Sequence, residues 1–164
     1  YFARSTADIE HDMLDNQNES RAGEPVMWRH TYQCGEETID RQHKDLFMYC
    51  NSVILAIEDK SLSLDQMPAI LDKFVADLSV HLTYEESLLS HLGYPGLDTH
   101  RRKHRALLAR LQNLHRLAIA RELSMDDLVS FVEWNGVVQH MLTDDHVYFP
   151  FLKKALQPDS TGTP

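Results

Sequence analysis

Residues 80–104, VHLTYEESLLSHLGYPGLDTHRRKH, contain two pairs of polar side chains at helical spacing. His81 and Glu85 are four residues apart, as are His100 and His104. Residues four apart lie on the same face of an α-helix, one above the other. The spacing therefore predicts two helices that each present a pair of metal-binding or hydrogen-bonding groups on one face.

The segment between the two pairs, LGYPG at residues 92–96, interrupts the helical pattern because glycine and proline are poor helix formers. We expect the chain to turn back there and to bring the pairs together across two antiparallel helices. Leucines at helical spacing surround both pairs, which predicts that each pair faces a hydrophobic core. Burying imidazoles and carboxylates without partners is costly, so these groups must be paired with each other or bind a metal.

Four amphipathic helices account for most of the chain. The apolar pattern predicts a first helix over residues 39–57, a second from an Asp65 N-cap to about residue 91, and a third from about 97 to about 120. A fourth begins at Ser124, in a capping-box pattern with Asp127, and continues to Pro150 or Leu156. The predicted fold class is all-α, an up-down-up-down four-helix bundle with an N-terminal extension.

The predicted domain organisation has three parts. Residues 1–25 form an acidic N-terminal extension or linker, residues 26–157 the bundle, and residues 158–164 a flexible C-terminal tail. The extension has six Asp or Glu residues against two arginines, so it is interpreted either as a tether to an upstream signalling module or as a frayed terminus.

Charge and composition exclude some classes of function. A formal net charge of −9 argues against non-specific binding to nucleic acid or to anionic membranes. No apolar run reaches the ~20 residues that a membrane segment needs, and no signal peptide is evident. Cys34 and Cys50 provide no disulfide framework, which favours reduced thiols in a cytoplasmic protein.

Every predicted helix contributes polar groups to its inner face, and together they make five imidazoles and two carboxylates. A single tetrahedral zinc needs only four ligands, so this set is too large for one zinc. Imidazoles with carboxylates suit iron, and two carboxylates can bridge two metals. The Glu-x-x-His pairs of ferritin-like di-iron bundles are absent. The seven residues are His43, His81, Glu85, His100, His104, His140 and Asp145.

In order and spacing, four motifs resemble those of the hemerythrin family, especially its bacterial members. The likeness extends from about Trp28 to about Leu156. The motifs are IDRQHKDLF (39–47), HLTYEE (81–86), GYPGLDTHRRKH (93–104) and HMLTDDHVY (140–148).

The resemblance implies two iron ions that alternate between Fe²⁺ and Fe³⁺. One iron is then held by His100, His104 and His140. The other is held by His43 and His81, with one position left open. Glu85 and Asp145 bridge the two ions together with a solvent-derived oxo or hydroxo group.

The function implied by the resemblance is dioxygen binding at the open iron position, in an oxygen or redox sensor domain or an oxygen carrier. Ligand binding or sensing is favoured over catalysis. One alternative is a di-iron reductase of nitric oxide or peroxide. Another is a bundle that sequesters iron or mediates contacts with partners.

Three residues are predicted to line the ligand pocket: Leu82, Gly136 and Val137. Leu82 occupies a position where the family usually has Phe, and Gly136 one where it usually has Trp. One turn before His140, a side chain at position 136 is expected to point toward the metals, so Gly136→Trp is expected to close the pocket. Trp134 is a candidate to fill the same space.

Two further acidic residues near the fourth-helix histidine could also face the centre. Glu133 is expected close to the inward face, seven residues before His140. Asp144 competes with Asp145 for the bridging position, and the family spacing favours Asp145.

Overall fold

The computed structural model describes residues 28–133 and 136–157, and all secondary structure in these residues is helical. A 3-10 turn, η1 (His30–Tyr32), precedes three long helices, α2 (Glu37–Glu58), α3 (Met67–His91) and α4 (Leu97–Ile119). The last arm contains α5 (Met125–Glu133), α6 (Val137–Gln139), the π-helix η2 (His140–Asp144), the 3-10 turn η3 (Asp145–Val147) and α7 (Phe149–Ala155).

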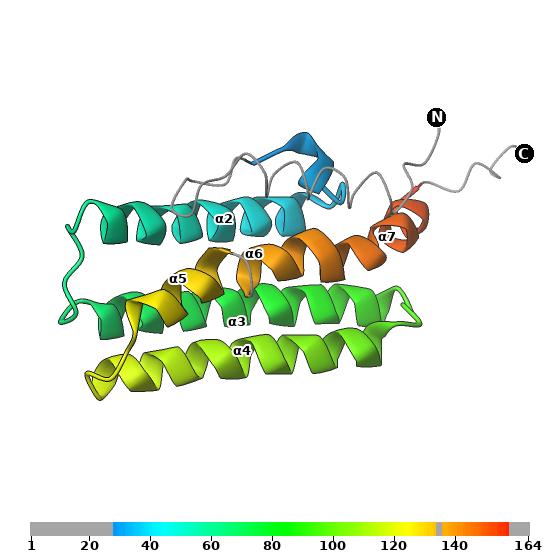
Figure 1. The fold of residues 1–164 in the computed structure, drawn as a ribbon. Helices are drawn as coiled ribbons and strands as arrows, with labels where there is room; N and C mark the ends of the chain where they lie inside the picture. The colour runs from blue at the N-terminus through cyan, green and yellow to red at the C-terminus, as the bar shows by residue number, and fades with distance from the viewer. Residues whose placement is uncertain (1–27, 134–135, 158–164) are drawn as a thin grey trace, which may run out of the picture.

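Successive arms run in opposite directions (Figure 1). The α2 and α3 helices are antiparallel, α4 returns beside α3, and the segmented last arm runs back along the bundle. The predicted up-down-up-down four-helix bundle is therefore confirmed. The predicted N-terminal extension (1–25) and C-terminal tail (158–164) lie outside the described residues.

The helix starts agree only in part with the expected caps. The Asp65 cap is wrong, because α3 begins at Met67 after Gln66 and Asp65 forms an exposed ion pair with Arg121 (3.0 Å). Ser124 does cap α5, since its hydroxyl accepts a hydrogen bond from the Asp127 backbone N–H at 3.4 Å.

Helix α2 begins two residues earlier than expected, because the Glu36 side chain caps it. The Glu36 carboxylate accepts a hydrogen bond from the Ile39 backbone N–H at 2.7 Å. This contact satisfies one of the backbone donors that an α-helix leaves free at its start.

The expectation that the fourth helix is continuous is wrong. The arm changes from α-helix to π-helix to 3-10 turn within residues 137–147. Trp134 lies outside the described residues, and so does the side chain of Glu133, so the expectations for both stay untested.

Gly136 explains part of this interruption. A Cβ placed on Gly136 would lie 2.1 Å from the backbone carbonyl oxygen of Phe131 and 2.8 Å from its ring. Only glycine permits such a close approach of backbone to backbone. The expectation that a side chain at position 136 points toward the metals is therefore wrong, because its first atom is directed at Phe131.

Two apolar clusters fill the bundle on either side of a polar layer. In α2, Phe47 belongs to the larger cluster and Ile39 to the smaller one, and His43 lies one turn from each. In α3, Leu78 belongs to the larger cluster and Leu89 to the smaller one. The polar residues of the inner faces therefore lie where the two clusters meet.

Cys34 and Cys50 are both buried and unpaired, in agreement with the absence of a disulfide framework. None of the helices formed by the described residues combines the length and apolar character needed to cross a bilayer.

Candidate metal centre

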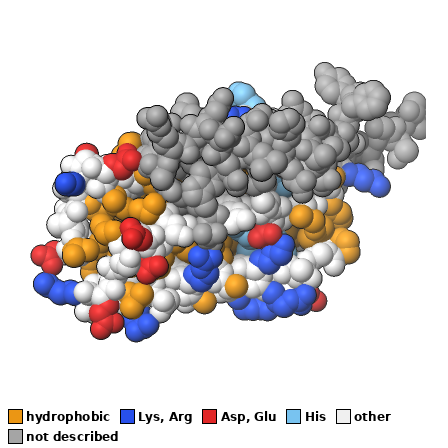
Figure 2. Space-filling model, in the orientation of Figure 1, with side chains coloured by type: hydrophobic (Ala, Val, Ile, Leu, Met, Phe, Trp, Pro, Cys, Tyr) orange, Lys and Arg blue, Asp and Glu red, His pale blue; other side chains and the backbone are white. Residues whose placement is uncertain are grey.

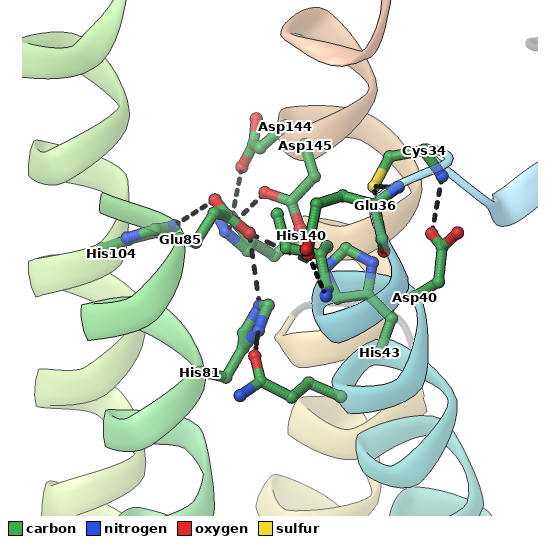
Figure 3. Close-up of polar contacts among 12 residues, drawn as sticks. Cys34, Glu36, Asp40, His43, His81, Glu85, His104, His140, Asp144 and Asp145 are labelled. Carbon is green, nitrogen blue, oxygen red and sulfur yellow. Dashed lines mark hydrogen bonds and ion pairs between the residues drawn. The ribbon is translucent and has the colours of Figure 1, made fainter. Parts of the chain in front are cut away.

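The seven polar residues singled out from the sequence converge in the middle of the bundle. Each is at most 5% exposed. They come from all four arms, and Figure 3 shows most of them pointing toward one another. By element, they are His43 from α2, His81 and Glu85 from α3, His100 and His104 from α4, His140 from η2, and Asp145 from η3.

Glu85 lies between two groups of histidines and directs one carboxylate oxygen at each. Its Oε1 is in close contact with Nε2 of His100 and lies 3.3 Å from Nε2 of His104. Its Oε2 lies 3.4 Å from Nε2 of His81 and 3.7 Å from Nε2 of His43. A carboxylate in this position has the geometry to bridge two neighbouring cations.

Asp145 repeats this arrangement from the opposite side. Its Oδ1 lies 3.0 Å from Nε2 of His140 and 3.4 Å from Nε2 of His100, whereas its Oδ2 lies 3.2 Å from Nε2 of His43. The site is thus a pair of adjoining donor groups that share carboxylates.

The π-helix brings His140 and Asp145 to the same site. In an α-helix with 3.6 residues per turn, residues five apart point about 140° away from each other. A π-helix, with its i→i+5 hydrogen bonds, turns more slowly, so residues five apart lie closer to the same face, and such turns occur often at functional sites. The wider turn at His140–Asp144 therefore allows both side chains to face the centre.

Many of the nitrogen and oxygen atoms that could bind a metal at the centre lack a hydrogen-bond partner. Although the ion-pair distances are short, the geometry leaves several buried atoms unsatisfied, which is costly unless another group binds them. The donor set is imidazole nitrogen with carboxylate oxygen, which suits iron. These atoms are Nε2 of His43, His81, His104 and His140, Oε2 of Glu85, and both carboxylate oxygens of Asp145.

The buried imidazoles and carboxylates of the centre shift one another's pKa values. Burial by itself would lower the pKa of His43, but contacts with Asp145 and Glu85 raise it to about 9. Burial is likewise outweighed at His140, where the Asp145 charge contributes most to a pKa of about 10. Burial and the neighbouring His43 lower the pKa of His81 to about 4. Without metal, the carboxylates are thus neutralised by imidazolium groups.

The carboxylates themselves stay ionised. Burial would raise the pKa of Glu85, but the nearby imidazoles of His100, His104 and His43 hold it well below its ordinary value. The pKa of Asp145 is also lowered, because the positive charge of His140 outweighs burial and repulsion from Glu85. Both carboxylates are therefore available as anionic ligands at neutral pH.

A second layer of residues, which the sequence pattern does not predict, contacts the outer nitrogens of the imidazoles. Glu86 Oε1 lies 2.9 Å from Nδ1 of His104, and Gln42 Oε1 lies 3.1 Å from Nδ1 of His81. Neither Gln42 nor Glu86 was singled out from the sequence. Their positions, each adjacent in sequence to a candidate ligand, are the only signal that could have identified them.

Asp144 also belongs to this second layer. Its Oδ2 lies 3.1 Å from Nδ1 of His140, so it contacts the ring from the side opposite to Asp145. Of the two aspartates that the sequence offers for the bridging position, Asp145 is the one whose carboxylate lies between the two donor groups.

Apolar and aromatic residues enclose the centre. Tyr148, which has no predicted role, is fully buried with its ring 5.4 Å from that of His100. Burial and the charges of Asp145 and Glu85 raise the pKa of the Tyr148 hydroxyl well above its ordinary value, so it stays neutral. Of the predicted pocket residues, Leu82 and Val137 are buried in the larger apolar cluster.

Residues 34–152 match the family model for the hemerythrin HHE cation binding domain. The chain is similar to a bacteriohemerythrin of Clostridium acetobutylicum, with 23% identity over 129 residues, which covers 74% of this chain and 97% of that protein. It is also similar to the myohemerythrin of Theromyzon tessulatum, with 27% identity over 125 residues, covering 76% and 92% respectively.

Proposed function

The chain belongs to the hemerythrin family, and from that premise we propose that it binds dioxygen at one of two unequal iron positions, as a sensor domain or a carrier. Hemerythrin domains hold two iron ions with an oxo bridge and bind dioxygen, and both properties extend to this chain. The proposal concerns which residues hold each ion, where the ligand binds and what role the binding serves.

We assign the ligands from the two donor groups. The three-histidine group consists of His100, His104 and His140, and the two-histidine group of His43 and His81. Asp145 is within reach of both groups. Glu85 also faces both groups, with a different oxygen toward each.

The unequal number of histidines is the observation that carries the proposal. With one oxygen from each carboxylate, the three-histidine group offers five protein donors and the two-histidine group offers four. A shared bridge would add one donor to each ion. Ions with six positions would then be fully coordinated at the three-histidine group and would keep one position free at the two-histidine group, and an open position is what ligand binding requires.

The chain's own residues prepare this position for a small neutral ligand. The side-chain oxygen of Gln42 contacts Nδ1 of His81 and fixes this ring, so Nε2 of His81 faces the centre. The surrounding donors are buried, which limits the access of water and anions. When bound, the iron pair supplies the electrons that dioxygen binding requires.

Gly136 gives no support to the alternative of a reductase with an enlarged pocket. A wider pocket is expected from the small side chains at both Leu82 and Gly136, whereas a Cβ at position 136 would face the Phe131 backbone. Reduction of nitric oxide or peroxide is therefore kept as the alternative result of the stopped-flow experiment described next.

Stopped-flow spectroscopy of the fully reduced, iron-loaded protein with dioxygen, and then with nitric oxide, tests the proposal. We expect a visible absorption that appears with dioxygen and disappears when dioxygen is removed, with the ferrous protein recovered. Oxidation without recovery, together with continuous consumption of nitric oxide or peroxide, would instead identify a reductase.

A further inference from the structure

The two donor groups differ in the charge of the residues behind them. In the three-histidine group, the outer nitrogens of His104 and His140 face the carboxylates of Glu86 and Asp144 at 2.9 and 3.1 Å. In the two-histidine group, the corresponding partner of His81 is a neutral amide, at 3.1 Å. The same hydrogen-bonding role is thus filled by two anions on one side and by an uncharged group on the other.

Each carboxylate is also held from outside by a cation of α4. Arg101 Nε donates to Oε2 of Glu86 at 3.2 Å, and Lys103 Nζ lies 2.5 Å from Oδ1 of Asp144. Lys and Arg side chains gather along the lower edge of Figure 2, where Figure 1 places α4. The cation fixes the carboxylate, and the carboxylate in turn fixes the ring.

A charged partner and a neutral partner have different effects on an imidazole ligand. A carboxylate that accepts the Nδ1–H bond raises the basicity of the ring and fixes its orientation. A more basic ligand, with a nearby negative charge, stabilises the more highly charged ferric ion. An amide can fix the orientation equally well but adds no net charge.

We propose that Glu86, Asp144 and Gln42 are positioning residues that make the two iron positions electronically unequal. Glu86 and Asp144 favour the ferric state at the three-histidine group, and Gln42 avoids that bias at the two-histidine group. The inference rests on the ligand assignment under the proposed function. It assigns roles to three residues that contact ligands from outside.

Solvent limits the size of the effect. The side chains of Glu86 and Asp144 are 27% and 30% exposed, so water screens part of their charge. We therefore expect measurable shifts in reduction potential without loss of the fold or of the iron.

Redox titration of the iron-loaded protein tests the roles of these residues. Glu86→Gln and Asp144→Asn retain an amide oxygen that accepts the Nδ1–H bond, so they remove charge while preserving orientation. Gln42→Glu adds the charge on the other side. Asp77→Asn is the matched control, because it removes an α3 carboxylate that forms an exposed ion pair with Lys73. Iron content is measured first in every variant.

Glu86→Gln and Asp144→Asn are each expected to raise the reduction potential of the iron at the three-histidine group, and the double variant is expected to raise it further. Gln42→Glu is expected to lower the potential, and Asp77→Asn to leave it unchanged. Removal and addition of charge are thus expected to shift the potential in opposite directions, which a purely structural role would not do. Glu86→Ala, which also removes the hydrogen bond, is expected to weaken iron binding by about 10–100-fold in chelator competition.

Two results have separate meanings. If wild-type protein holds fewer than two irons, the proposed function fails. If it holds two, but the charge-removing variants give the same potential as Asp77→Asn or shift it in the same direction as Gln42→Glu, the inference of unequal tuning is overturned.

Discussion

Asp144 and Asp145 are neighbours in the chain, yet they contact opposite nitrogens of the same imidazole. Asp145 is completely buried and lies 3.0 Å from Nε2 of His140, whereas Asp144 is partly exposed and lies 3.1 Å from Nδ1. The π-helix makes this possible, because it places both the fourth and the fifth residue after His140 within reach of the ring. One ring is thereby held between a carboxylate at the centre and a second that leads to the surface.

We expect close to two iron ions per chain in protein produced with ample iron. His81→Ala or Glu85→Ala should reduce the iron content, because each removes a donor that faces the centre. His91→Ala is the matched control, since His91 is an exposed histidine of the same helix. Metal analysis by mass spectrometry measures the content. One tightly bound zinc per chain, with His43 and His81 free, would contradict the assignment.

Metal-free protein should lose stability at alkaline pH. The pKa values of His43 and His140 are raised to about 9 and about 10 in the folded state. Their contribution is complete below the unfolded value of ~6.5 and is lost as pH rises through the folded values. At about 1.4 kcal/mol per pKa unit, the loss from His43 is on the order of 3 kcal/mol.

Urea unfolding of metal-free protein at about pH 7 and above about pH 10 measures this loss. His81 has the opposite sign, because its lowered pKa of about 4 gives stability that disappears as pH falls below ~6.5. Iron-loaded protein is the comparison, since metal binding has already deprotonated the imidazoles. An equal alkaline loss in both forms would show that these histidines are not its source.

Acidification should release iron. Protons compete with the metal for imidazole nitrogens, so occupancy is expected to fall as pH drops below ~6.5. Iron bound to a chromogenic chelator, followed over time at several pH values, measures the release. Unchanged occupancy at low pH after long incubation would argue against a shell rich in histidine.

Gly136→Ala should destabilise the fold, and Gly136→Trp more so. The added Cβ would meet the Phe131 carbonyl oxygen at 2.1 Å, so the backbone must shift. Overpacking of this kind typically costs about 1–3 kcal/mol. Gln139→Ala, at an exposed position of α6, serves as the control. Urea unfolding compares the variants, and full stability of Gly136→Ala would show that this segment adapts without cost.

Removal of residues 1–24 should leave a folded protein that still binds iron. This segment is polar and has few apolar residues to bury. All seven candidate ligands and both apolar clusters lie within the described residues. Circular dichroism and iron content of the truncated chain measure the outcome. Loss of helicity or of iron would show that the extension packs against the bundle.

The sequence by itself determined the bundle and the identity of the inward-facing polar groups. His81, Glu85, His100 and His104 occur at the four-residue spacing that puts them on one face of each helix, and glycines and a proline mark the turn between them. These signals are local in the chain, so periodicity is enough to detect them.

Tertiary structure decided what depends on contacts between distant residues. Two of the second-layer contacts join residues on different helices, as between Glu86 on α3 and His104 on α4, so no spacing within one helix predicts them. What a side chain at position 136 would meet depended on the Phe131 backbone, which lies next to Gly136 in the folded chain. The pairing of His140 with both Asp144 and Asp145 depended on a π-helix, because the α-helical period would turn the fifth residue away from the centre.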